Sequence, residues 1–316
     1  MENKIISRII RETGNTSLFK TLTEDLSSSD FQSLLLEVYK KRTDALSASQ
    51  VFKQYCSSRF VPPVQYPAEA MLQLEQYVYS IRPEGFEAIE LSPVGPLGNC
   101  SVVATVSQNK VLSASRNLEL VADATNMMAL EAAKRRKGQG SKATVKLCTS
   151  HRHIRTQQLA SPEHSAHFKI FCAVTAGRDE GAFSFELREL QEHLSYHIGI
   201  LSHPAFGFNP QQIEIRLTRL NQHLSQALII EQLINPLQDI HEGVLFKFDP
   251  ERETGRGYYQ CLCFKINVSI PGKGEFEFGD GGFTNWTQQY LGNKKERFLI
   301  SALGTEIILN ITGAFR

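Results

Sequence analysis

The first sixty residues carry the hydrophobic spacing of helices. In residues 27–42, Phe31, Leu34 and Val38 recur every three to four positions, so they fall on one face of a helix. Residues 47–60 repeat this pattern over a shorter length. We therefore expect consecutive amphipathic helices at the start of the chain.

A pair of prolines interrupts the helical pattern. Pro62 and Pro63 cannot continue a helix, because proline lacks the backbone N–H and its ring clashes with the preceding turn. We place a boundary here and expect an N-terminal helical segment over residues 1–62 and a larger domain over residues 63–316. The larger domain opens with a helical pattern at residues 67–82.

The larger domain alternates between strand-like and helix-like stretches. Helical patterns also occupy residues 122–137, 183–201 and 224–235, and residues 296–311 predict a strand followed by a helix. Strand patterns fall at residues 85–98, 142–157, 167–177, 212–217, 244–248, 258–270 and 274–283, with a hairpin expected at 101–115 whose tip carries Lys110. The sum predicts an α+β fold: a mixed, mostly antiparallel sheet flanked by helices.

Composition narrows the class of protein. The 34 Lys and Arg residues nearly balance the 33 Asp and Glu residues, whereas nucleic-acid-binding proteins usually carry a basic excess. The basic run at residues 132–142 is typical of a solvated helix end. No stretch reaches the roughly 20 apolar residues of a membrane-spanning helix, and the N-terminus carries acids that a signal peptide lacks. We expect a cytoplasmic protein without a membrane partner.

The six cysteines are dispersed through the chain, which favours buried free thiols over disulfides. Cys261 and Cys263 are two apart on a predicted strand, so we expect their side chains on one face. No second closely spaced pair of cysteines completes a zinc site. We therefore assign no metal to them.

Polar residues gather at two predicted element ends. Asp123 and Thr125 stand at the head of the helix at 122–137, where helix capping alone would explain the aspartate. The stretch "GRGYYQCLCFKINV" at 255–268 runs from a glycine–arginine–glycine turn through Tyr258 and Tyr259 into a strand. This second stretch is either the wall of a ligand pocket or a hairpin with an apolar face.

A third group of polar residues surrounds a strand–loop–strand unit. Arg155 ends the first strand and is followed by Gln157, while His167 and Phe168 open the returning strand. The chain then ends with paired glycines, Gly281 and Gly282, a strand and a helix.

In this order, from about residue 67 to residue 310, the chain resembles the catalytic domain of class II aminoacyl-tRNA synthetases. Within that class it is most similar to the histidyl-tRNA synthetase branch and to its non-catalytic relative, the regulatory subunit of ATP phosphoribosyltransferase. The resemblance implies a homodimer formed through residues 67–96, where the family has a helix that feeds a strand ending at a proline, here Pro93.

The resemblance also implies roles for the residues that hold ATP. Arg155 matches the arginine that binds the ATP α-phosphate, as expected for a fixed guanidinium beside developing charge. Gln157 and His167, which precedes Phe168, stand where the family carries acids, so the usual handling of ATP and Mg²⁺ is altered. The helix that carries an adenine-stacking arginine in the family reads Ile307 here.

The remaining roles concern the amino acid. By resemblance, Asp123 and Thr125 bind its α-amino group. Tyr258 and Tyr259 shape the side-chain pocket, and Gly281 and Gly282 let the backbone approach the ligand. Arg256 would neutralise the carboxylate or the phosphate, although "RGYY" lacks the two spacer residues that the family places before the tyrosines.

Two functions follow as expectations. The first is an enzyme that activates an amino acid or related carboxylic acid with ATP, as an acyl-adenylate, with Arg155 and Arg256 as catalytic residues. Because no anticodon-binding domain follows, we expect a non-tRNA acceptor such as a carrier protein. The alternative is a non-catalytic, amino-acid-sensing subunit that works with an enzyme partner.

Four histidines accompany the strand–loop–strand unit. His151 and His153 are two apart on a strand, and His164 and His167 are three apart on the loop and the returning strand. Together they could bind Zn²⁺, act as general bases or contact a ligand, or they could simply be solvated. The sequence leaves these alternatives open, and we assign no metal.

Overall fold

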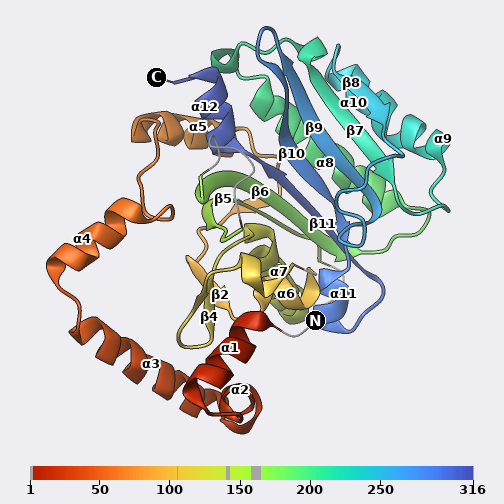
Figure 1. The fold of residues 1–316 in the computed structure, drawn as a ribbon. Coiled ribbons are helices and arrows are strands. Elements are labelled where there is room, and N and C mark those ends of the chain that lie inside the picture. The colour runs from red at the N-terminus through yellow and green to blue at the C-terminus, as the bar shows by residue number, and fades with distance from the viewer. Residues whose placement is uncertain (1–2, 105, 140–142, 158–164, 316) are drawn as a thin grey trace.

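An eight-stranded mixed sheet forms the centre of the molecule (Figure 1). The computed structural model describes residues 3–104, 106–139, 143–157 and 165–315. The strands run in the order β1-β5-β6-β11-β10-β9-β7-β8. Only the edge pairs β1–β5 and β7–β8 are parallel, and all other neighbours are antiparallel. The expected α+β fold with a mixed, mostly antiparallel sheet is therefore confirmed.

The sheet strands are β1 (Phe86–Ala88), β5 (Val145–Ile154), β6 (His167–Arg178), β7 (Ile213–Arg219), β8 (Leu245–Phe248), β9 (Gln260–Ile270), β10 (Gly274–Thr284) and β11 (Glu296–Leu303). A smaller sheet contains β2 (Val94–Pro96), β4 (Leu118–Leu120) and β3 (Ser113–Ala114). The longer helices are α1 (Lys4–Thr13), α3 (Ser28–Asp44), α4 (Ala48–Ser57), α5 (Ala68–Ser80), α7 (Ala124–Gln139), α8 (Ser184–Leu201) and α12 (Thr305–Thr312). The shorter ones are α2 (Leu18–Lys20), η1 (Thr21–Asp25), α6 (Asn99–Val103), η2 (Gln108–Lys110), η3 (Pro204–Phe206), η4 (Pro210–Gln212), α9 (Gln226–Ile229), η5 (Ile230–Ile234), α10 (Asn235–Ile240) and α11 (Trp286–Leu291).

The two faces of the sheet are covered by different helices. Along β6, Phe171 and Ala173 join a core with α5, α8 and α12, while Cys172 and Val174 join a second core with α7 and α11. This alternation is the period-two pattern of a strand that is buried on both faces. Helices thus lie on both faces of the sheet (Figure 1). The face that carries α7 also carries the cavity described below.

The hairpin expected at residues 101–115 is wrong. The chain forms the short helices α6 and η2 there, and only Ser113–Ala114 is a strand. The cause is a tertiary contact: the carboxylate of Glu119, on β4, accepts hydrogen bonds from the backbone N–H groups of Gly98 (2.8 Å) and Cys100 (3.1 Å). A carboxylate at this position satisfies the free donors of a helix start, so α6 forms despite its β-branched residues.

The expectation that Cys261 and Cys263 share one face is also wrong. Cys261 adopts a left-handed conformation (φ 60°), and the pairing of β9 with β10 shifts register here, from Cys263 opposite Gly282 to Gln260 opposite Phe283. The irregularity breaks the alternation of side chains. Cys261 consequently packs against the core on the α8 face, whereas Cys263 joins the core on the α7 face.

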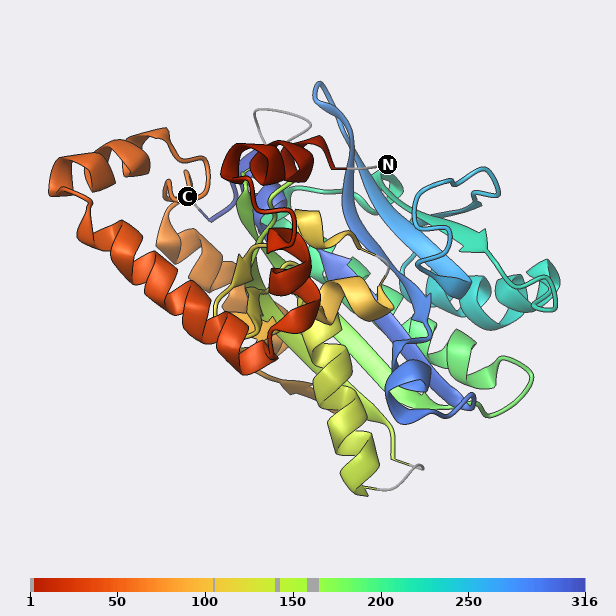
Figure 2. The same cartoon turned by 60° about the horizontal axis from the view of Figure 1, so that its bottom comes forward.

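Helices α1–α4 form an arm that extends from the body and returns toward it (Figures 1 and 2). None of the four contains a buried residue. Polar contacts tie the arm to the body: Asn117 bonds to Ser28 and Gln32, and Arg59 donates to the carbonyl oxygens of Thr156 and Gln157. By contrast α5, the helix expected at 67–82, buries four side chains. The boundary near residue 62 stays a prediction.

None of the helices in the described ranges is both long and apolar enough to cross a membrane.

Candidate functional site

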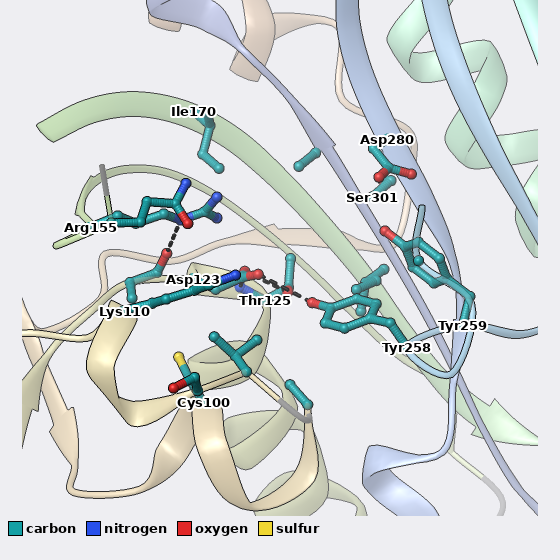
Figure 3. Close-up of a pocket in the computed structure, with 18 of the residues that line it drawn as sticks. Cys100, Lys110, Asp123, Thr125, Arg155, Ile170, Tyr258, Tyr259, Asp280 and Ser301 are labelled. Atoms are coloured by element: carbon teal, nitrogen blue, oxygen red, sulfur yellow. Dashed lines mark hydrogen bonds between the residues drawn. The ribbon is translucent and has the colours of Figure 1, made fainter. Parts of the chain in front are cut away.

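A cavity of about 570 Å³ lies over the α7 face of the sheet (Figure 3). Its walls come from α6, the start of α7, the chain after β5, the turn before β9, and strands β10 and β11. Small-molecule sites usually have volumes of this order. The polar and charged side chains of the wall include Lys110, Asp123, Thr125, Arg155, Gln157, Arg256, Tyr258, Tyr259, Glu277 and Asp280.

Arg155 and Lys110 make one end of the cavity cationic (Figure 3). Arg155 directly follows β5, and its Nε donates to the carbonyl oxygen of Ala122 (3.0 Å). Its guanidinium lies 5.2 Å from the centre of the Phe168 ring, a cation–π arrangement that fixes its plane. The structure gives neither Arg155 nor Lys110 an ion pair with another described residue. Their charges are therefore free to meet an anionic group of a ligand.

Asp123 lies beside this cationic end and is held by three hydrogen bonds. Its Oδ1 accepts from the N–H (2.9 Å) and the hydroxyl (2.7 Å) of Thr125, and its Oδ2 accepts from the hydroxyl of Tyr258 (3.2 Å). The carboxylate thus caps α7 and also faces the cavity, so the two explanations offered for it are compatible. Burial raises the pKa of Tyr258 well above its usual value, which keeps its hydroxyl a donor to Asp123.

Tyr259 and Asp280 lie on the side of the cavity opposite Arg155 (Figure 3), and Glu277, on the same strand as Asp280, also lines it. Asp280 accepts from Nη2 of Arg252 at 2.9 and 3.1 Å, and burial raises the pKa of this carboxyl group. Glu277 pairs with Lys265 (2.6 Å). The sequence pattern did not predict these acids, although Asp280 directly precedes the paired glycines. What was lacking was the register of β10, which decides the face on which each residue lies.

Arg256 lines the same cavity as Arg155, as their proposed convergence requires. Its side chain is exposed and donates to two backbone carbonyl oxygens, those of Arg252 (2.7 Å) and Pro250 (3.1 Å). These bonds stabilise the turn before β9. The guanidinium is consequently engaged with the turn, while that of Arg155 faces the ligand space.

Comparison with known proteins places this geometry in a structural class. No family model matches the sequence, and no curated protein matches it significantly. Solved structures do match. Histidyl-tRNA synthetase from S. aureus superimposes with a TM-score of 0.56 at 14% identity, over 80% of this chain and 71% of that one. A Bacillus halodurans protein described as an ATP phosphoribosyltransferase regulatory subunit/histidyl-tRNA synthetase gives 0.58 at 11% identity, over 81% and 83%. Histidyl-tRNA synthetase from Nostoc gives 0.56 at 13% identity, over 80% and 75%.

The chain has the class II aminoacyl-tRNA synthetase fold. At these identities the likeness shows the fold alone. The resemblance drawn from the order of the sequence pieces is confirmed at that level, and the roles of individual residues remain predictions.

Not all residues expected at the site reach the cavity of this class II fold. Gln157 lines it, and Phe168 lies behind Arg155 as its stacking partner. His167 is outside the lining: its Nδ1 accepts from Arg152 (3.0 Å) and its Nε2 donates to the carbonyl oxygen of Pro62 (2.7 Å). His167 therefore connects the body to the chain that leads from the arm.

Gly281 and Gly282 do not line the cavity either. A Cβ atom on Gly281 would lie 2.6 Å from the Phe264 ring and from the carbonyl oxygen of Ile300. One on Gly282 would lie 2.5 Å from the Cβ of Cys263. Close packing between strands explains why both positions need glycine.

The described histidines do not gather around a metal position. The rings of His151 and His153 lie 5.5 Å apart, as expected for one strand face, and burial lowers the pKa of both. Nε2 of His153 accepts from the N–H of Ala124 (2.7 Å) and so helps to start α7. His164 lies outside the described residues. In the described part of the chain, no three His, Cys, Asp or Glu side chains are placed to hold a metal ion.

Proposed function

We propose that this chain binds an amino acid or related carboxylic acid in the cavity and acts as a ligand-sensing protein. The observation that carries this proposal is the set of unpaired charges. Arg155, Lys110 and Asp123 line one part of the cavity, and the structure gives none of the three an ion pair with a described residue. An α-amino acid supplies the complementary pair, one carboxylate and one ammonium group.

The proposed binding mode follows from these positions. The carboxylate of the ligand meets the guanidinium of Arg155 and the ammonium of Lys110 in charge-assisted hydrogen bonds. The ammonium group meets Asp123, whose orientation is fixed by Thr125 and Tyr258. Because the Phe168 ring and the Ala122 carbonyl already hold Arg155, little side-chain entropy is lost when the ligand binds.

The class II fold also implies ATP with Mg²⁺, but the residues at the expected adenine position do not fit that base. Ile307, where the family carries the adenine-stacking arginine, packs against the core on the α8 face. The neighbouring Glu306 accepts from Arg152 (3.0 Å) and from the N–H of Lys169 (3.0 Å). Neither residue is free to stack on adenine, so the way in which the family holds this base does not apply here.

A second candidate function is the activation of the bound acid as an acyl-adenylate, followed by transfer to a non-tRNA acceptor. The orientation of Arg155 supports it, because the Nη atoms of this guanidinium make no hydrogen bond with a described residue and could meet a phosphate as well as a carboxylate. Arg256 would then complete the charge neutralisation after releasing its two carbonyl partners.

We also propose two copies paired through residues 67–96. Leu72 on α5 is 63% exposed, and β1 is an edge strand of the large sheet. Exposed apolar side chains beside an unpaired strand edge are features that association covers. A sensing subunit in the cytoplasm would in addition require an enzyme partner, and an activating enzyme would require a carrier-like acceptor.

A thermal-shift screen of the common amino acids, with and without ATP–Mg²⁺, identifies the ligand, and titration calorimetry then measures its affinity. We expect Arg155→Gln to weaken binding at least tenfold, because a hydrogen bond to a charged group contributes about 1.5–3 kcal/mol. Arg42→Gln, a change of the same kind on the exposed face of α3, should leave the affinity unaltered.

Pyrophosphate exchange into ATP separates the two functions. Exchange that depends on the bound acid and is lost in Arg155→Gln would establish activation and overturn sensing. Binding of an amino acid without exchange supports sensing. If no amino acid shifts the unfolding temperature, both proposals fail.

A further inference from the structure

The cavity carries more polar side chains than the carboxylate and the ammonium group of an amino acid would occupy, among them Tyr259, Glu277 and Asp280. In the binding mode proposed above, the side chain of the ligand would extend away from Arg155 and Asp123, toward these residues. Figure 3 shows Asp280 and Tyr259 on the side of the cavity away from Arg155 and Lys110. The chemistry of this end therefore decides which side chain fits.

A β-bulge places the two acids together. The register of β10 against β9 shifts between Glu277, opposite Asn267, and Gly279, opposite Ile266, so Phe278 is an extra residue. In a regular strand, residues three apart face opposite sides. The bulge reverses the alternation after Phe278, and Glu277 and Asp280 both reach the cavity.

The carboxylate of Asp280 lines the cavity, whereas the guanidinium of its ion-pair partner, Arg252, does not. Arg252 is only 5% exposed and does not line the cavity. Its Nε and Nη1 donate to the carbonyl oxygens of Thr254 (2.8 Å) and Phe264 (3.0 Å). The side chain of Asp280 stays 38% exposed, so its oxygens keep lone pairs for a further donor.

The hydroxyl group of Tyr259 gives an independent indication that a ligand belongs at this end of the cavity. The residue is only 9% exposed, yet the structure gives its hydroxyl no hydrogen bond with a described residue. Its ring is held by the guanidinium of Arg252, 5.4 Å from the ring centre. Because this hydroxyl group opens onto the cavity, it is available to a polar group of a ligand. In Figure 3 this hydroxyl points to the same region as Asp280.

We propose that Tyr259, Glu277 and Asp280 form a subsite for a second cationic group, so that the ligand is an amino acid with an amine or guanidine side chain. The inference rests on the proposed function and names its substrate class. An ammonium or guanidinium group donates to Asp280 and to the Tyr259 oxygen at once, while a neutral aliphatic side chain leaves both unsatisfied. Glu277 at the rim adds a second negative charge, partly offset by Lys265.

Matched pairs of amino acids test the inference by titration calorimetry on the full chain. L-Lysine is compared with L-norleucine, and L-arginine with L-citrulline, since each pair has nearly the same shape and differs in charge. We expect one cationic member to bind at least tenfold more tightly than its neutral counterpart. Equal or weaker binding of the cationic members overturns the subsite.

Two variants assign the preference to named atoms. Tyr259→Phe removes only the unpartnered hydroxyl, so the fold should be kept while the preference for the cationic ligand falls severalfold. Asp280→Asn should reduce the preference to less than about threefold. The control is Glu275→Gln on the same strand, which contacts Arg216 and Asn267 outside the cavity and should keep the full preference.

The outcomes separate the two levels of the proposal. If neutral amino acids bind at Arg155 as tightly as cationic ones, the subsite is wrong and the proposed function stands. If Tyr259→Phe keeps the full preference, the second cation is not bound where we place it. If no amino acid binds, both the subsite and the proposed function are overturned.

Discussion

Two histidines beneath the cavity, His193 and His197, are buried in their neutral form. His193 hydrogen-bonds to Thr175 and Ser301 (2.8 Å each), and His197 bonds to the same Ser301 hydroxyl (2.7 Å). Both imidazoles lie on α8 and are fully buried, which lowers the pKa of His193 well below its usual value and that of His197 to about 3. The neighbours of Ser301 on β11, Ile300 and Ala302, line the cavity. This network therefore supports the floor of the site.

Because these two histidines are held neutral in the folded chain, we predict that the free energy of unfolding decreases in mild acid. In the unfolded chain an imidazole binds a proton below about pH 6.5, while the folded His197 stays neutral to about pH 3. The stabilising effect is thus complete above pH 6.5 and decreases as the pH falls toward 3. Each such histidine should lower the free energy of unfolding by about 1.4 kcal/mol per pH unit below 6.5.

Urea unfolding at pH 7.5, 6.5 and 5.5 measures this slope. His197→Gln removes one titrating group, so its free energy of unfolding should depend less steeply on pH than that of the parent chain. Equal slopes in the two proteins would show that His197 is not held neutral in the folded state.

The family resemblance led to several residues that line the cavity but not to its two acids, Glu277 and Asp280. Arg155, Asp123, Tyr258 and Tyr259 all line the cavity, because strand ends and a helix start converge there in this fold. Asp280 was not foreseen, because its face depends on a bulge that periodicity does not show. His167 was placed at the site on the strength of the family pattern, yet its bonds are to Arg152 and Pro62.

At the scale of elements, strands and long helices were predictable and short elements were not. The strands around β5–β6 and β9–β10 carry their own alternating pattern, and α8 carries a helical one. The helix α6 depends on Glu119, a residue 16 positions beyond the end of that helix, so its local sequence misled the prediction. In such short segments, a contact that exists only in the folded chain decides whether a helix or a strand forms.

The close approach of β9, β10 and β11 gives a prediction at this scale. Gly281→Ala places a methyl group against Phe264 and the backbone of Ile300, and overpacking of this kind costs about 1–3 kcal/mol. Gly138→Ala is the control, because its new methyl group meets no atom within 4 Å and lies in α7. There we expect unchanged or slightly higher stability.

Denaturant midpoints compare the two alanine variants. A midpoint for Gly281→Ala equal to that of Gly138→Ala would mean that the strands do not approach as closely as described, and would reopen a ligand-contact role for this glycine.

At the scale of the whole molecule, the arm α1–α4 contacts the body but contributes no buried side chain to its hydrophobic core. It exposes several large apolar side chains, among them Phe19, Val51 and Phe52, and α3 contacts the body at Asn117. The arm is the part for which the sequence predicted helices but no role. Its function depends on what covers these side chains.

A shortened chain tests whether the body folds without the arm. Residues 58–316 keep α5, Arg59 and both cores of the large sheet. Because no side chain of α1–α4 is buried, we expect cooperative unfolding within about 4 °C of the full chain, which corresponds to roughly 1 kcal/mol at this size. A much lower unfolding temperature, or an unfolded product, would show that the boundary near residue 62 is misplaced.

The central claim is that the free guanidinium of Arg155 and the carboxylate of Asp123 receive the two charged groups of one amino acid. The most direct measurement is a crystal structure of the full chain with the tightest ligand of the thermal-shift screen. Our account predicts the ligand carboxylate within about 3 Å of the Arg155 guanidinium and its ammonium group beside Asp123. Ligand density outside this cavity, or inside it with the carboxylate away from Arg155, would contradict the account.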